Sequence, residues 1–562
     1  MTRETPAIPN GTAEPAPAGA GPECRDATDE TFGLLHALRR EHRLRRRGDT
    51  AFHLYVVLLL TAVYLVPFGA MAYGAAGGPR EPWASYAREA LPCAGTAVAL
   101  TWLRVVVGDA RWRGPALLDA ATAAWLLPAP VDRGRLLRPG LRRAVVLHAT
   151  VAGLLTAVAG YFLNLVMLGR PTAGIGLAAA AAAAFGALTV GTAALVVCRD
   201  AVVSARRAAT ALTALAAAAL LCAVSAAPAW AQSVLLWSGP WGWVTQCLAA
   251  ASGAPPVGWP VAAALLVGCA AWVVRRADRE IAGVPVGVLL RRIRSATSVS
   301  AAVVSVDFRR ARLAVRQAGA GGARSRLPAL PAPRRPELVV PWRTAVGWLA
   351  GPGRLGWAAV WLAGAYTAVT VAPAAEGLDR AAAVLVALAA GYGAAAGLLE
   401  AARLDGDDVN RSRALPWAFP GIVLRHAALP LVVLSAAGGA ACALVAVLGR
   451  PVLPAVLLLC CFPALVGAAL VSACRGTLPL ELLVGADTAM GNTAVIQVAV
   501  WYLRGPLAAC AVLFPFLAYG LRCVERGAPS LLAGCVMGGG LLLGTAGLAA
   551  WAGVRAWSHV RG

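Results

Sequence analysis

The chain has 562 residues, of which 59% are hydrophobic and only 14% are charged, and its mean hydropathy is +0.68. This composition excludes a soluble globular protein of that size, which would be far less apolar. The formal net charge is +23, but the basic residues lie between long apolar runs, so nucleic acid is not an expected partner.

Long apolar runs recur along the whole chain. A bilayer core about 30 Å thick needs roughly 20 apolar helical residues to span it. Runs of about this length occur at 52–73, 91–107, 144–168, 175–197, 208–230, 257–274, 355–372, 381–399, 427–448, 453–474, 506–521 and 531–551. The sequence therefore predicts an all-α, polytopic transmembrane helical bundle of about 12 spans.

The segments outside these runs divide the chain into regions. Residues 1–30 are rich in Pro, Ala, Gly and Glu and are expected to form a disordered cytosolic tail. Residues 284–337 form an Arg- and Pro-rich linker, also expected in the cytosol. On either side of the linker lie a first half, 31–283, and a second half, 338–562. Each half begins with an amphipathic segment that is able to lie on the membrane surface.

The two halves resemble copies of one another. The tetrapeptide Leu-Gly-Arg-Pro ends the third run of each half, at 168–171 and 448–451. A Cys-Arg pair ends the fourth run of each, at 198–199 and 474–475, and a Leu-Pro turn follows each second run. Because each half has an even number of runs, the sequence predicts two parallel six-helix repeats.

All 50 basic residues are Arg, and their placement predicts an orientation. Most of them flank the runs on one side, which is the cytoplasmic side by the positive-inside rule. We therefore expect a multi-pass protein of the plasma membrane with both termini in the cytoplasm. The chain contains no Lys, so it lacks the lysine of a phosphate-binding loop.

The predicted spans contain few polar or charged side chains. None of the 27 Asp and Glu residues falls inside a predicted span, which argues against an ion-coupled transporter. We expect no catalytic residue, no bound cofactor and no metal in this chain. Thr156, Asn164 and Gln497 are candidates for lining a substrate path, although polar groups in spans also simply bond a neighbouring helix.

The loops after the second and the eighth run are the strongest candidates for a functional site. Each contains a Pro-bounded turn followed by apolar residues with flanking Arg, and a short helix of this kind could dock into a groove of a cytosolic partner. The alternative interpretation is a solvated turn. The candidate contact residues are Pro128, Pro130, Asp132, Arg133, Leu136, Leu137, Leu415, Pro416, Trp417, Pro420, Ile422 and Leu424.

Asp405, Asp407 and Asp408 allow a different hypothesis. Closely spaced carboxylates at a membrane edge could hold Mg²⁺ and a diphosphate, as in intramembrane prenyltransferases. Such enzymes need a second acidic motif, and the first half offers only separated Asp residues. The alternative to a transporter is therefore an ATPase-independent membrane protein, either a scaffold or an enzyme that uses this cluster.

The pattern of six spans per half, an amphipathic segment before each half and a helical loop after the second span resembles the permease subunits of type-2 ABC exporters. The resemblance is to two such halves fused in one chain, as in some actinobacterial exporter permeases. It implies coupling helices near 130–143 and 415–425 and short outer helices near 235–251. It also implies a separate ABC ATPase subunit, a homodimer that binds the ATP, and an exported substrate of unknown identity beside the membrane lipid.

Overall fold

The computed structural model describes residues 83–115, 118–129, 131–162, 174–224, 228–305, 331–351, 353–374, 377–476, 481–488, 491–525 and 531–561, and isolated positions outside these ranges. The chain is an all-α, polytopic helical bundle, as the sequence predicts. The strands among the described residues form one short hairpin, β1 (Asp487–Thr488) and β2 (Gly491–Asn492).

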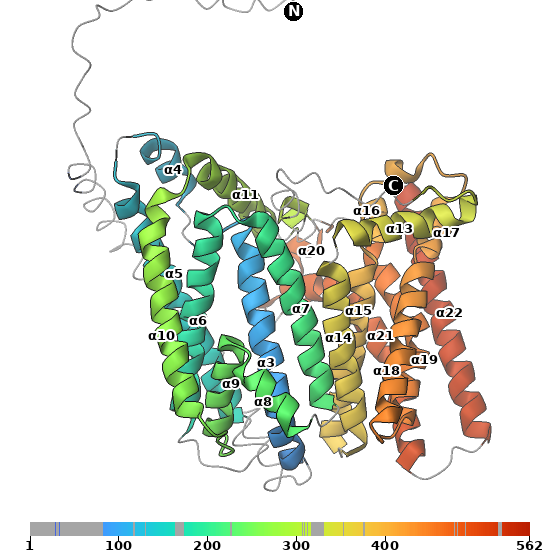
Figure 1. Cartoon of the computed structure of the whole chain (residues 1–562). Helices are drawn as coiled ribbons and strands as arrows, with labels where there is room; N and C mark the ends of the chain where they lie inside the picture. Colours follow the sequence, from blue (N-terminus) through green and yellow to red (C-terminus); the bar gives the residue numbers. More distant parts are fainter. Residues whose placement is uncertain are drawn as a thin grey trace, which may run out of the picture.

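Nine helices of the described residues are long and apolar enough to cross a membrane, and each matches a predicted span. Two further predicted spans correspond to α7 (Val202–Val224) and α14 (Gly353–Val371), which run alongside the others (Figure 1). The first predicted span, 52–73, lies outside the described residues. The nine are α3 (Trp83–Ala110), α5 (Arg133–Phe162), α6 (Ile175–Cys198), α10 (Trp259–Glu280), α15 (Gly377–Leu398), α18 (Ala428–Val447), α19 (Leu453–Ala473), α21 (Ala494–Glu525) and α22 (Leu531–Arg561).

The same helix pairs pack together in both halves. In the first half α3 contacts α6 and α7, and α6 contacts α5 and α10. In the second half α15 contacts α19 and α21, and α19 contacts α18 and α22. These pairs correspond one to one when the spans are taken in chain order, so the halves share one arrangement as well as short sequence motifs.

One helix lies at the centre of each half, and both central helices are rich in small side chains. In the most apolar stretch of α6 and of α19, 61% and 72% of the residues are buried, against 6% for α5. A Cβ at Gly186 of α6 would lie 2.7 Å from the carbonyl oxygen of His148 on α5. Small residues let helix backbones approach closely inside a membrane, which explains why the Ala- and Gly-rich α6 is central.

The two halves meet where α7 contacts α14. Gly356 of α14 lies directly against Thr213 of α7, because a Cβ at position 356 would come within 2.8 Å of the Thr213 methyl carbon. Arg104 of α3 bonds the Thr213 hydroxyl and also lies over Trp357 of α14. The contact therefore combines close backbone packing with one charged side chain.

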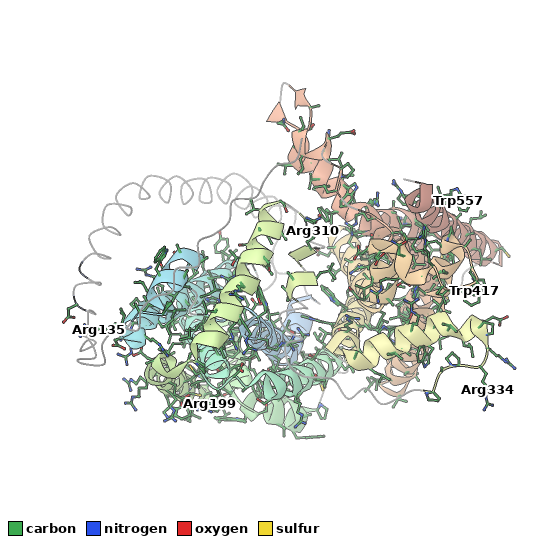
Figure 2. All side chains as sticks on the ribbon, turned by 90° about the horizontal axis from the view of Figure 1, so that it is seen from above. Arg135, Arg199, Arg310, Arg334, Trp417 and Trp557 are labelled. Atoms are coloured by element: carbon green, nitrogen blue, oxygen red, sulfur yellow. The ribbon has the colours of Figure 1, made fainter. Side chains whose placement is uncertain are left out.

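The eleventh span starts earlier than the sequence indicates. The predicted run begins at Pro506, whereas α21 begins at Ala494 and continues through Pro506 and Pro515. Proline is tolerated within membrane helices because neighbouring helices satisfy or cover the freed backbone groups. Here Gly505 lies tightly against Ser472 of α19, which holds this part of α21 in the bundle. Between α19 and α21 lie α20 (Glu481–Val484) and the hairpin, which project from the second half (Figure 2).

Short helices cap both ends of the bundle (Figure 1). At one end lie α8 (Ala229–Trp237) and α9 (Pro240–Ala251), in the segment for which the family resemblance implies outer helices. The opposite end, which we call the loop end, carries further helices that are not counted among the spans. These are α4 (Ala120–Leu126), α11 (Val286–Val304), α13 (Val339–Ala350), α16 (Glu400–Asp407) and α17 (Phe419–Arg425).

Candidate functional site

The loop between α3 and α5 folds around the short helix α4. The carboxylate of Asp119 accepts a hydrogen bond from the backbone N–H of Thr122 at 3.0 Å and so caps the start of this helix. Ala123 and Leu127 face inward and are buried, whereas the Trp125 side chain is 80% exposed. The helix cap therefore holds the exposed Trp125 indole in a fixed position at the surface.

Leu136 and Leu137 do not belong to the exposed surface of this loop. The sequence places the start of the third span at 144, but α5 already begins at Arg133, so this stretch is the first turns of a long helix. Both leucines are buried in one cluster with Leu127 and with Val288 of α11. They fasten α4 and α11 to the bundle, because their helix turns them toward the interior.

The other predicted contact residues of the first loop have mixed positions. Pro128, Asp132 and Arg133 are exposed. Asp132 also accepts a hydrogen bond from the backbone N–H of Gly134 at 2.8 Å, which helps to start α5. Pro130 lies outside the described residues.

A buried arginine holds α11 against this loop. Arg292 of α11 is 5% exposed, and its guanidinium donates to the carbonyl oxygen of Ala110 at 2.6 Å. It also lies 3.7 Å from the carboxylate of Asp200, which follows α6. Burial lowers the pKa of Arg292. Beside the loop, residues 112–113 and 118–120 line a half-open cavity of about 520 Å³ together with α11.

The second loop presents a comparable surface around α17. Phe419, Ile422 and Val423 are buried, so they anchor this helix, while Leu424 is 42% exposed. The guanidinium of Arg425 lies 4.3 Å from the centre of the Trp417 ring, and Figure 2 shows Trp417 over the second half. Pro416 is exposed, and Leu415, Trp417 and Pro420 are half-buried. The two predicted loops therefore lie at the same end of the bundle, over different halves.

Asp405 is the centre of a buried polar network beneath the second loop. Its carboxylate accepts hydrogen bonds from Ser412 at 2.7 Å and from Arg343 at 3.1 Å, and it lies 3.1 Å from Nε2 of His426. The Thr344 hydroxyl lies 3.0 Å from the other ring nitrogen of His426. Burial alone would raise the pKa of Asp405, but the bonds from His426 and Ser412 and the Arg343 charge outweigh it, and the pKa is lowered.

This network bears on the hypothesis of a magnesium site. Asp405 turns inward to Arg343 and His426, whereas Asp408 is exposed and caps the following turn by accepting from the backbone N–H of Asn410 at 3.1 Å. Asp407 is exposed as well. Within the described part of the chain, no group of three or more His, Cys, Asp or Glu side chains is placed to hold a metal ion. The three aspartates do not converge.

The candidates for a substrate path are dispersed. Thr156 lines a cavity of about 450 Å³ between α3, α5, α6 and α9, whose lining is apolar except for Thr156, Ser252 and the Trp102 indole N–H. Gln497 instead donates to the Thr493 hydroxyl at 3.0 Å near the start of α21. Asn164 lies outside the described residues. Of the three, only Thr156 is therefore seen to line a cavity.

Sequence reasoning missed Trp125, Arg292 and the contacts of Asp405. A signal existed for Trp125, because it is a single large aromatic residue in the Ala-rich stretch 120–126, next to a Leu-Pro turn. No local signal marks the other two, since Arg292 is one of many arginines and the Asp405 partners come from separate elements. Comparison of the chain with protein-family models, with curated proteins and with solved structures gives no match.

Proposed function

We propose that the chain is the permease subunit of an ATP-binding cassette exporter, driven by a separate ATPase subunit. One observation carries this proposal. Each half holds a short helix in the loop between its second and third span, at the same end of the bundle (Figure 1). In the first half α4 precedes the Leu-Pro turn, and in the second half α17 follows it. Each helix exposes a large apolar side chain, Trp125 or Leu424.

These side chains suit a protein interface. Trp and Arg are the residues that most often contribute large shares of binding energy when they are held rigidly at a contact. Trp125 stands on a helix that Asp119 caps, and Leu424 lies beside the stacked pair Trp417 and Arg425. The cavity that α11 forms with residues 112–113 and 118–120 gives the first loop a neighbouring recess for a partner side chain.

The packing of both loops supports a mechanical role. Leu127 and Leu137 join the first loop to the ends of α5 and α6, and Phe419 and Val423 join the second loop to the core of the second half. A force on α4 or α17 is therefore transmitted to whole spans, because closely packed side chains cannot yield independently. Rigid-body movement of one half against the other would then open and close a route between them.

In this proposal the energy comes from a separate ATPase polypeptide. The chain has no Lys, so it cannot contribute the lysine that reaches the phosphates in a phosphate-binding loop. The two loops join corresponding spans of the two halves, so each subunit of a homodimeric ATPase would contact one of them. The excess of Arg on this side of the spans favours a cytoplasmic loop end and a plasma-membrane location with both termini inside.

The cavity beside Thr156 suits an apolar portion of an exported molecule. No charged side chain lines it, and its volume of about 450 Å³ falls in the range of small-molecule sites. The substrate route in this proposal includes this cavity and the contact of α7 with α14.

Co-purification from native membranes tests the proposal. The full chain should retain a nucleotide-binding ATPase subunit, and Trp125→Asp combined with Leu424→Asp should reduce the retained ATPase at least about tenfold. The reason is that removing the two introduced carboxylates from water in a packed contact is energetically costly. The matched control is Trp230→Asp on α8, where an equally large aromatic residue is 71% exposed at the opposite end of the bundle.

The result is informative in either direction. Full retention in the control with loss in the double variant supports coupling through these loops. If the wild-type chain retains no ATPase, or if the double variant exports and retains its partner as well as the control does, the exporter proposal is wrong. Elution of all variants as a single monodisperse species shows that they remain folded.

A further inference from the structure

Arg104 lies inside a span, at the seam where the two halves meet. It belongs to α3, six residues before the helix ends, and its side chain is half-buried. Its Nε donates to the Thr213 hydroxyl of α7 at 2.8 Å, and its guanidinium lies over the Trp357 ring of α14. Charged side chains within spans are rare, and they commonly mark the path of a substrate or an ion.

The direction of this side chain differs from that of an interfacial anchor. An arginine that only anchors a helix end extends its charged group to the water. Arg104 instead reaches Thr213, which is completely buried and lies eleven residues after the start of α7, about 16 Å along that helix. The guanidinium is therefore directed into the contact between the halves.

No carboxylate neutralises this guanidinium among the residues that the structure describes. Its contacts there are the neutral Thr213 hydroxyl and the Trp357 ring, and it forms no ion pair with an Asp or Glu. The charged neighbour that acts on it is Arg111, which has the same sign. Removing a charge from water without a partner is costly, so an anion bound at this position would be stabilised.

The guanidinium is oriented by one nitrogen and keeps its other donors. The Thr213 hydroxyl donates its own proton to the Ala209 carbonyl oxygen, so it is an acceptor for Nε of Arg104. The two terminal nitrogens of Arg104 form no hydrogen bond with the described part of the chain. A planar guanidinium offers paired N–H donors that match the oxygens of a carboxylate, sulfate or phosphate.

An aromatic surface lies beside the guanidinium. Trp357 stacks on Trp361, with ring centres 6.4 Å apart and an angle of 28° between the rings. Trp361 is 46% exposed, so this surface is accessible. Indole rings are large apolar contacts. A cation next to two of them suits a molecule that joins an acidic group to an apolar body.

We propose that Arg104 binds the anionic group of the exported molecule, and that this molecule is an amphiphile with an acidic group and an apolar body. The inference rests on the proposed export function, in which the route includes the contact of α7 with α14. The acidic group pairs with Arg104 of the first half, and the apolar body contacts Trp357 and Trp361 of the second. Movement of the halves apart separates these two contacts and releases the molecule.

Photolabelling of the purified full-length chain in neutral detergent micelles tests this site without an ATPase. The probe is laurate that carries a diazirine, and mass spectrometry quantifies the label in peptides of α7 and α14. Unlabelled laurate, lauryl alcohol or lauryltrimethylammonium is added as competitor. Laurate should displace the label at a concentration about tenfold lower than the other two, because only its carboxylate forms charge-assisted bonds. Arg104→Gln should abolish this preference, whereas Arg104→Lys should keep it in weaker form, since lysine retains the charge without the paired donors.

Arg413→Gln is the matched control, because it removes one exposed arginine from the loop before α17, outside the seam. It should leave the preference for laurate unchanged. Equal displacement by laurate and lauryltrimethylammonium in the wild type, or an unchanged preference in Arg104→Gln, would overturn the anion site. If the preference is absent while the chain retains an ATPase, this inference is wrong and the exporter proposal stands. If the preference is present but no ATPase is retained, the anion site stands and its role in export is wrong.

Discussion

The guanidinium of Arg104 lies 4.4 Å from the centre of the Trp357 ring, so a charged side chain of the first half packs on an aromatic ring of the second. Its Nε also donates to the Thr213 hydroxyl at 2.8 Å. Arg104 lies six residues before the end of α3, about 9 Å along the helix, which is close enough to the membrane boundary for an arginine to be tolerated. The side chain thus joins three helices at the seam between the halves.

This contact predicts an energetic coupling between the halves. Arg104→Gln and Trp357→Leu should each lower the free energy of unfolding, and the double variant should lose about 1 kcal/mol less than the sum, because a partly buried cation–π contact contributes about that much. The measurement is a double-mutant cycle by denaturant titration in micelles. Arg104→Gln combined with Trp230→Leu, at the opposite end of the bundle, should be additive. Additivity of the first pair would mean that the ring contact contributes nothing.

Adjacent glycines of α18 predict opposite responses to the same substitution. A Cβ at Gly438 would lie 2.7 Å from the Tyr366 hydroxyl and from a Phe462 ring carbon, whereas a Cβ at Gly439 would meet nothing within 4 Å. Gly438→Ala should therefore lower the free energy of unfolding by about 1–3 kcal/mol through overpacking. Gly439→Ala should be neutral or slightly stabilising, since alanine favours helix. Similar unfolding midpoints for the two variants would contradict the close approach of α14, α18 and α19.

The lowered pKa of Asp405 predicts a dependence of stability on pH. A carboxyl whose pKa is lower in the folded than in the unfolded chain adds stability above its unfolded value, here 3.8, and this stability is lost as the pH falls through the folded value. Asp405→Asn should destabilise the protein by about 3 kcal/mol at pH 7, since Arg343 loses its buried partner. The difference from the wild type should shrink below about pH 4. Asp408→Asn serves as the exposed control, and a pH-independent difference for Asp405→Asn would refute the role of its charge.

Substitutions of Leu137 and of Leu424 should affect different properties, the first the stability of the fold and the second the binding of a partner. Leu137 is completely buried and Leu424 is 42% exposed. Leu137→Ala should lower the free energy of unfolding by about 2–5 kcal/mol, because it leaves a cavity between α4, α5 and α11. Leu424→Ala should change the unfolding free energy by less than about 1 kcal/mol and act on partner binding instead. Circular dichroism melts of both variants distinguish these effects, and comparable losses of stability would show that Leu424 is a core residue.

Much of the fold could be predicted from the sequence because a membrane imposes a simple rule. Apolar helices must be about as long as the bilayer is thick. Runs such as 175–197 and 453–474 therefore predict the ends of α6 and α19 to within one residue. The rule gives less where a helix extends beyond the bilayer. The start of α5 at Arg133 was missed because its first turns contain several arginines and Pro139, which resemble a loop. The start of α21 at Ala494 was missed because Arg504 and Pro506 interrupt its apolar run.

The sequence by itself determined the apolar runs, and it supports three predictions: their sidedness through Arg, the duplication, and the two loops as the places of interest. Each of these depends on composition or on short local patterns, which need no knowledge of neighbours in space. Only the tertiary structure decided that Leu136 and Leu137 face the core while Trp125 faces outward. It also brought Arg343, Asp405 and His426 together from separate elements, because helix packing sets such contacts and residue order does not.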